Sequence, residues 1–405
     1  MLKKEISIPL SCSVFVAVTT FVFYSISISL VSIDMMGRFI AIFSLSAMLQ
    51  TFFVPQTWIY VFGAKNLEDR VGNVSIAIIM EWLGFFAGLL IVFTLIFFLN
   101  QQKSLLYSFI ALSFAGSNSS IGFLRGEKKW IGYIACFTMP TILRLITLII
   151  SINNGDLATL SLNGFIINFF LIPELVRYFI FTGFIVSKHF EFCSLVNLKN
   201  GIAKIYNNWF YDLGSSIVDI GDKYFLSFMV SPKLLVIYFF VRKIGSATTI
   251  ITETFYAHCY SLFSDLYGYC FARSVLIKGY LLALITAFTI LILVAISKHI
   301  SLLGVFPVPS IVVNDIQIFA ILVFIDSFVT ANKWGRYLSL ISNKALNLLY
   351  VRLANFIIFI IFVYFANSML SSSNSLTTGF LIYCTIDFFY VAYLITLFNS
   401  RALYK

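Results

Sequence analysis

Charged side chains stand inside two apolar segments near the middle of the chain, where they could bind a charged ligand. Lys223, Arg242 and Lys243 each lie in a run of mostly apolar residues. Arginine offers a planar fork to a phosphate group, and lysine offers a compact positive charge. If the segments 205–231 and 234–257 are antiparallel helices, the three cations fall at similar depth. The pattern predicts a cationic site for a phosphate or an acidic sugar.

Carboxylates and other polar groups accompany these cations at helical spacing. One stripe consists of Asn208, Asp212, Ser216, Asp219 and Lys223. A second stripe consists of Arg242, Ser246, Thr249 and Glu253. Such spacing places the members of a stripe on one face of a helix, and that face must line water or another helix. Asp222 lies beside the first stripe, and Asp219 precedes Lys223 by one helical turn, at which side chains pair.

Further ionisable residues occur in the other apolar segments, where they are costly to bury and usually functional. They are Glu81, Arg144, Glu174, Arg177, Asp326, Arg352 and Asp387. Glu174 and Arg177 have helical pairing spacing and are expected to form an ion pair. Asp326 and Arg352 lie at similar depth in neighbouring predicted spans and suit an interhelical bridge. Asp387 is isolated and is a candidate for binding a coupling proton or sodium ion.

The elements that position these groups are long apolar helices. Of the 405 residues, 60% are hydrophobic and 11% are charged, whereas soluble domains are about 25% charged. A bilayer needs about 20 apolar residues per crossing helix, and only helices or closed barrels can cross it. The runs are continuous and too long for barrel strands, so we expect an all-α integral membrane protein with about twelve transmembrane helices. The predicted spans are 6–33, 38–62, 74–99, 104–124, 130–152, 158–187, 205–231, 234–257, 275–297, 311–332, 346–369 and 376–399.

Loop charges predict the topology. If the N-terminus is cytoplasmic, most Lys and Arg residues fall in cytoplasmic loops, as the positive-inside rule requires. We therefore expect a multi-pass inner-membrane protein with both termini in the cytoplasm. The predicted domains are an N-terminal six-helix bundle, 1–187, a cytoplasmic linker, 188–204, and a C-terminal six-helix bundle, 205–405. Matched halves with a substrate path between them are typical of transporters.

Several function classes fit the sequence poorly. It has no Walker motif, no metal-spaced histidine cluster, no Ser/His/Asp set and no large extramembrane loop. The net charge of +10 follows the loop asymmetry rather than forming a nucleic-acid-binding patch. We therefore expect a transporter and not an enzyme, with no cofactor, no metal and no nucleic acid partner.

Two segments carry a resemblance to a known family: Asp219-Ile-Gly-Asp-Lys-Tyr-Phe-Leu-Ser and Tyr238-Phe-Phe-Val-Arg-Lys. Together with twelve spans and a six-plus-six division, they resemble the bacterial O-antigen (Wzx-type) polysaccharide flippases. These proteins belong to the multidrug/oligosaccharidyl-lipid/polysaccharide (MOP) exporter superfamily, whose fold is MATE-like. The resemblance covers essentially the whole chain.

This resemblance implies a flippase in the bacterial inner membrane. It would move undecaprenyl-pyrophosphate-linked oligosaccharide repeat units from the cytoplasmic to the periplasmic leaflet by alternating access, driven by an ion gradient. The implied substrate-binding residues are Lys223, Arg242, Lys243, Arg144 and Arg352. The implied ion-coupling residues are Asp219, Asp222, Asp326 and Asp387. The implied partners are lipid-linked oligosaccharide, membrane lipid, H⁺ or Na⁺, and other polysaccharide assembly proteins.

Two alternatives stay open at this point. A MATE-type multidrug or cation antiporter would favour acidic residues in its cavity, whereas basic residues are prominent in 234–257. A membrane enzyme of polysaccharide assembly, such as a polymerase or acyltransferase, would favour a large outer loop or a nucleophile. An enzyme changes the covalent structure of a lipid-linked sugar, and a flippase does not.

Overall fold

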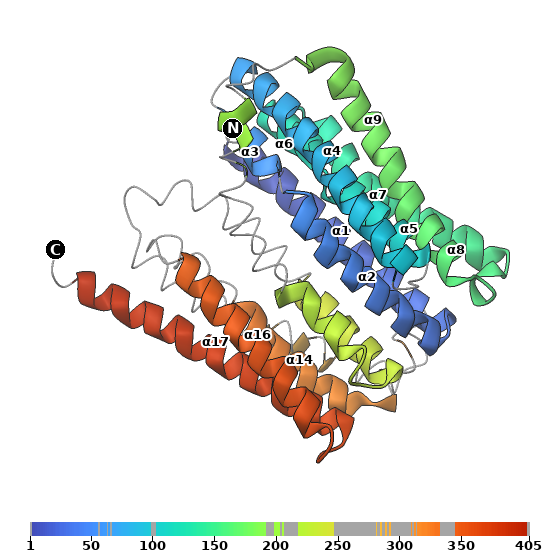
Figure 1. The fold of residues 1–405 in the computed structure, drawn as a ribbon, viewed down its shortest axis with the longest axis vertical. Coiled ribbons are helices and arrows are strands. Elements are labelled where there is room, and N and C mark those ends of the chain that lie inside the picture. Colours follow the sequence, from blue (N-terminus) through green and yellow to red (C-terminus); the bar gives the residue numbers. More distant parts are fainter. Residues whose placement is uncertain are drawn as a thin grey trace. The chain divides into compact units, whose positions relative to one another are not determined.

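The computed structural model describes the larger part of the chain. The described ranges are 2–55, 57–62, 64, 67–98, 103–191, 198–202, 205, 218–246, 314–332 and 345–402, with short pieces between 281 and 312. Every regular element in these ranges is a helix (Figure 1). This agrees with the all-α prediction.

Within the described residues, six helices are long and apolar enough to cross a membrane. They are Ser7–Leu30, Ile33–Phe53, Leu67–Phe98, Trp130–Asn153, Leu162–His189 and Ser372–Tyr393. Shorter apolar helices cover Ile316–Thr330 and Tyr350–Ala366. Each overlaps a predicted span. Residues 206–217 of the span 205–231, most of 275–297 and residues 247–257 of the span 234–257 lie outside the described residues. Asn208, Asp212, Ser216, Thr249 and Glu253 therefore lie outside them too.

The chain forms two compact units. Unit 1 comprises Met1–Gly37 and Phe225–Lys405, and unit 2 comprises Arg38–Tyr224. Unit 1 thus combines the first helix with the C-terminal part of the chain. The predicted division into two six-helix bundles around a linker at 188–204 stays a prediction.

Unit 2 is built from closely packed apolar helices. They are most of α2 (Ile33–Phe53), α3 (Trp58–Phe62), α4 (Leu67–Phe98), α5 (Lys103–Gly116), α6 (Ser119–Gly126), α7 (Trp130–Asn153), α8 (Leu162–Ile166) and α9 (Ile172–His189). Helix α4 packs against α5, and α9 packs against both α5 and α7 (Figure 1). At the α4–α5 contact, Gly88 makes room for the fully buried ring of Phe109, which a Cβ at that position would meet.

Three interruptions shape the helices of unit 2. Pro55 follows the end of α2 instead of kinking a continuous span, because proline disfavours helical backbone in the residue before it. The single span predicted at 104–124 is two helices, α5 and α6, separated at Ser117 and Asn118. Helices α8 and α9 run together through a π-helical turn, Ile167–Leu171, placed just before Pro173. A π turn is one way to accommodate a missing hydrogen bond within a helix.

Unit 1 contains the helices that carry most of the sequence-predicted site. They are α1 (Leu2–Leu30), the helix at 232–246, α14 (Ile316–Asn332), α16 (Ala345–Ala366) and α17 (Ser372–Ala402). Helix α17 packs against α14 and α16 (Figure 1). The ring of Phe240 contacts those of Phe21 in α1 and Phe319 in α14. Residues 234–241 are all buried. The charged residue Arg242 follows directly after this buried segment.

Candidate functional site

A buried ion pair joins two helices of unit 1. Nη1 of Arg242, in the helix at 232–246, donates to Oδ1 of Asp326, in α14, over 2.7 Å. Arg242 is 8% exposed and Asp326 is 2% exposed. Gly245 leaves the space that the carboxylate occupies, because a Cβ at Gly245 would meet Oδ2 of Asp326. The structure therefore seats this carboxylate in a notch beside the arginine.

Aromatic rings surround the cations of the same helix. The Lys243 Nζ atom lies 5.1 Å from the ring centroid of Tyr24 and 5.2 Å from that of Phe239. The guanidinium carbon of Arg242 lies 5.7 Å from the ring centroid of Phe380. The faces of aromatic rings attract cations. Both positive charges are thus held by ring faces in addition to any carboxylate.

The other sequence-predicted residues of unit 1 lie on α16 and α17. Arg352 in α16 and Asp387 in α17 are each 4% exposed. Nδ2 of Asn355 donates to the carbonyl of Tyr383 over 2.7 Å and lies 3.4 Å from Oδ1 of Asp387. The structure shows a bond from Asp326 to a residue of the helix at 232–246, and the predicted bridge from Asp326 to Arg352 stays a prediction.

Lys223 is held within its own helix in unit 2. Its Nζ atom lies 2.8 Å from Oδ1 of Asp222 and 2.5 Å from the backbone carbonyl of Asp219. Lys223 thus bonds to the backbone of Asp219 and to the carboxylate of Asp222, and its pairing with the carboxylate of Asp219 stays a prediction. Lys223 belongs to unit 2, whereas Arg242 and Lys243 belong to unit 1. The predicted cluster of these three cations therefore stays a prediction.

A second charged network crosses unit 2. Arg144 in α7 lies 2.6 Å from Oε1 of Glu174, and Nε of Arg177 lies 3.1 Å from Oε2 of the same carboxylate. The pairing of Glu174 with Arg177 confirms the sequence prediction. Nε of Arg144 also donates to the carbonyl of Phe169 over 3.0 Å. That carbonyl lies in the turn where Pro173 supplies no N–H group, so Arg144 supports a weakened piece of helix.

The break between α5 and α6 is supported by a cation on one side. Nη2 of Arg177 donates to the carbonyl of Phe114 and lies 3.5 Å from the carbonyls of Ala115 and Ser117. The last carbonyls of a helix have no partner within the helix and carry partial negative charge. The guanidinium of Arg177 therefore satisfies the C-terminal end of α5.

A carboxylate supports the other side of this break. Glu81 in α4 accepts hydrogen bonds from the N–H and hydroxyl of Ser119, both 2.9 Å long, and from the hydroxyl of Thr57. Ser119 is the first residue of α6, so a negative group stands at a helix N-terminus, where it is favoured. Sequence analysis noted Glu81 only as one of several buried charges. The signal it did not use is Ser117-Asn118-Ser119-Ser120, a polar interruption of the predicted span.

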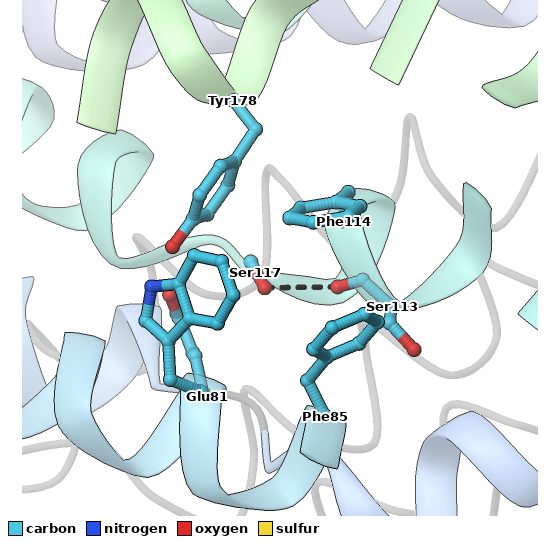
Figure 2. A pocket seen from close by; sticks show the side chains of 7 residues that line it. Glu81, Phe85, Ser113, Phe114, Ser117 and Tyr178 are labelled. Carbon is cyan, nitrogen blue, oxygen red and sulfur yellow. Dashed lines mark hydrogen bonds between the residues drawn. The ribbon is translucent and has the colours of Figure 1, made fainter. Parts of the chain in front are cut away.

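A small pocket lies beside Glu81. Its lining consists of Glu81, Trp82, Phe85, Ser113, Phe114, Ser117 and Tyr178. Figure 2 shows the hydroxyl of Tyr178 pointing toward Glu81, and the Ser117 hydroxyl donating to the carbonyl of Ser113, over 2.8 Å. In this arrangement the pocket has no room for a water molecule. The pocket is therefore a dry contact between α4, α5 and α9.

Comparisons with solved structures identify the fold, whereas comparisons of the sequence find no family. No family model matches the chain, and no curated protein matches it. A structure described as the inward-facing conformation of a multidrug resistance MATE family transporter of the MOP superfamily has a TM-score of 0.62 and 11% identity, covering 98% of this chain and 96% of its own. A eukaryotic MATE transporter gives a TM-score of 0.63 and 14% identity over 98% of this chain and 95% of its own.

A further match shows that the likeness extends over whole chains. A MATE protein in complex with MaD3S has a TM-score of 0.60 and 13% identity, with 98% of this chain and 97% of that chain covered. At identities this low, a shared structure is evidence of the fold and not of the activity. The chain is a multi-pass membrane protein with the all-α fold of MATE transporters.

Proposed function

We propose that this protein is a MOP-type transporter that carries lipid-linked oligosaccharide across a bacterial inner membrane. Its substrate would be the undecaprenyl-pyrophosphate-linked repeat unit of an O-antigen or related surface polysaccharide, moved from the cytoplasmic to the periplasmic leaflet. The observation that carries the proposal is the buried Arg242–Asp326 pair, placed in a MATE-like fold.

The cost of this pair is the first step of the argument. Taking two charges out of water costs several kcal/mol per ion, and their attraction often does no more than offset that cost. Neither the helix at 232–246 nor α14 has a break beside Arg242 or Asp326, so the backbone there needs no charged support. Charges inside membrane helices without a structural need are functional candidates.

The chemistry of the pair supplies the second step. A guanidinium binds phosphate oxygens in the same bidentate way as it binds a carboxylate. Arg242 can therefore exchange Asp326 for the pyrophosphate of the substrate. Asp326 then loses its countercharge and becomes a site for H⁺ or Na⁺. This exchange links the binding of substrate to the binding of the coupling ion.

The remaining predicted residues have supporting roles in this proposal. Further contacts to pyrophosphate or acidic sugars come from Lys223, Lys243, Arg144 and Arg352. Further coupling candidates are Asp219, Asp222 and Asp387. Both termini lie in the cytoplasm, and other polysaccharide assembly proteins receive the product.

A MATE-type multidrug or cation antiporter is the second candidate, and the fold comparison favours it. The named structural neighbours are MATE transporters, one of them described as a multidrug resistance protein. In this alternative, Asp326 binds the cationic substrate directly and Arg242 releases it by competing for the carboxylate.

The test is complementation of a bacterial strain whose own oligosaccharide flippase is deleted. The wild-type chain should restore surface polysaccharide, and the double variant Arg242→Ala/Lys243→Ala should abolish it at unchanged membrane abundance. Lys233→Ala is the matched control, because Lys233 pairs with Asp315 at the start of α14 but is half exposed. Normal polysaccharide in the double variant would remove both residues from the site. Drug resistance without restored polysaccharide would favour the antiporter.

A further inference from the structure

We propose that Glu81 is a proton-binding site at the α5–α6 break of unit 2. The proposal deepens the proposed function, on which its transport consequence rests, because it adds a coupling residue that the sequence did not assign. It stands on three features: neutral hydrogen-bond partners, full burial, and a carboxylate placed at a helix terminus.

Within the described part of the chain, the hydrogen-bond partners of the Glu81 carboxylate are neutral groups. Oε1 accepts from the Ser119 N–H and from the Thr57 hydroxyl, and Oε2 accepts from the Ser119 hydroxyl. Glu81 is only 1% exposed. Burial works against the charged form, whereas these donors and the N-terminus of α6 work for it. The opposing influences suit a group that gains and loses a proton.

The hydrogen bonds can accommodate the proton without a change of partner. A proton added to Oε2 makes this atom a donor, and the Ser119 Oγ atom accepts from it, because a hydroxyl can donate or accept. Oε1 keeps its bonds to the Ser119 N–H and to Thr57. The Ser119 hydroxyl turns its own hydrogen away from Oε2, and the added proton neutralises the negative charge of Glu81.

The charge of Glu81 acts on the helices around the break. It faces the N-terminus of α6 through Ser119, and it interacts electrostatically with Arg177 and Tyr178 of α9. Arg177 is itself paired with Glu174 and holds the last carbonyls of α5. Neutralising Glu81 weakens the attraction of α4 for both ends of the break. Proton binding therefore loosens the α5–α6 junction.

The pocket beside Glu81 offers the proton a route. Figure 2 places the hydroxyls of Ser117 and Tyr178 on the pocket side of Glu81. Hydroxyl groups relay protons because each can donate and accept. Since the closed pocket admits no water, exchange is slow until the helices around it separate. The site is thus occluded in this arrangement, as a coupling site must be in one state of the cycle.

The experiment is a pH titration of the full chain in lipid, followed by the infrared absorption of protonated carboxyl groups. The wild-type protein should show a pH-dependent carboxylic acid band of which one component is lost in Glu81→Gln. Glu127→Gln is the matched control, because the Glu127 carboxylate pairs with Arg70 in the same unit. Identical spectra for the wild type and Glu81→Gln would overturn the proposal.

A second variant covers the case in which Glu81→Gln does not fold. Thr57→Val removes one donor to the charged form and should move the midpoint of the titration to higher pH; an unmoved midpoint would contradict the proposal.

Transport supplies an independent readout. In Glu81→Gln vesicles, flipping driven by a pH gradient should fall at least tenfold, while exchange without a gradient continues. If wild-type vesicles flip no oligosaccharide, the proposed function fails but the infrared result still decides the proton site. Dependence of the Glu81 band on Na⁺ in place of pH would overturn the assignment.

Discussion

Buried charges are used differently in the two units of this protein. In unit 2, Arg144 bonds to the carbonyl of Phe169 near Pro173, and Arg177 bonds to the carbonyls at the end of α5. Glu81 accepts from the first N–H of α6. In unit 1, Arg242 and Asp326 pair on helices that run unbroken past both residues.

The difference separates charged side chains that pair with backbone groups at helix breaks from charged side chains that lie beside no break. A broken helix inside a membrane leaves backbone groups that water cannot satisfy, and these must be paired by protein. The charges of unit 2 meet that need, so a change of charge there is felt by the backbone. The pair in unit 1 lies beside no helix break in the described residues, and substrate binding is the explanation that we propose for its cost. Three substitutions test this difference between the units.

The largest effect is expected for Arg177→Met. The change leaves the carbonyl of Phe114 without its donor and removes one partner of Glu174. Breaking a buried ion pair costs about 3–5 kcal/mol, so the variant should unfold far more readily than the wild type. The measurement is unfolding by SDS in mixed micelles, compared with accumulation in the membrane.

The control for this prediction is Lys188→Met, which changes an exposed cation near the end of the same helix. It should alter stability by no more than about 0.5 kcal/mol. An Arg177→Met protein that is as stable as the wild type but inactive would erase the distinction between the units.

A smaller effect is expected for Gly245→Ala in unit 1. The new methyl group would meet Oδ2 of Asp326 and Oγ1 of Thr330, so the carboxylate must move away from Arg242. Overpacking of this kind costs about 1–3 kcal/mol. The transport rate should fall by a larger factor than the loss of folding stability explains. Both quantities can be measured on the same vesicles.

Gly183→Ala in α9 is the matched control, since a Cβ there meets nothing within 4 Å. Alanine is favoured over glycine in helices by up to about 1 kcal/mol, so this variant should be at least as stable as the wild type. Equal transport by the two alanine variants would show that the notch beside Asp326 has no role in function.

The sequence predicted the helices well because each membrane crossing requires a long apolar run. It missed the break at Ser117 and Asn118, because four small polar residues lower hydropathy too little to end a predicted span. The predicted span 38–62 also ran past Pro55, whereas α2 ends before it, at Phe53. Whether a proline bends or ends a helix depends on the partners available to its freed carbonyls, and those come from elsewhere in the chain.

The candidate site was predictable only where pairing is local. Glu174 and Arg177 lie one turn apart, and their ion pair follows from helix geometry. Arg242 and Asp326 are separated by 84 positions, so their pairing depends on how α14 packs, which no periodicity reveals. Lys223 shows what helical spacing does not reveal, because its long side chain also reaches the carboxylate of the adjacent Asp222.

The smallest effect is expected for Arg144→Lys in unit 2. Lysine keeps the charge beside Glu174 but has no second donor fixed in direction toward the carbonyl of Phe169, which Arg144 supplies through Nε. Loss of one hydrogen bond costs about 1 kcal/mol, and it should appear as faster amide hydrogen exchange around 169–174. Arg38→Lys, at an exposed position, should leave that exchange unchanged. If Arg144→Lys instead abolished transport with unchanged exchange, the proposed substrate contact of Arg144 would outweigh its support of the helix, and its charge would no longer be explained by the broken helices of unit 2 alone.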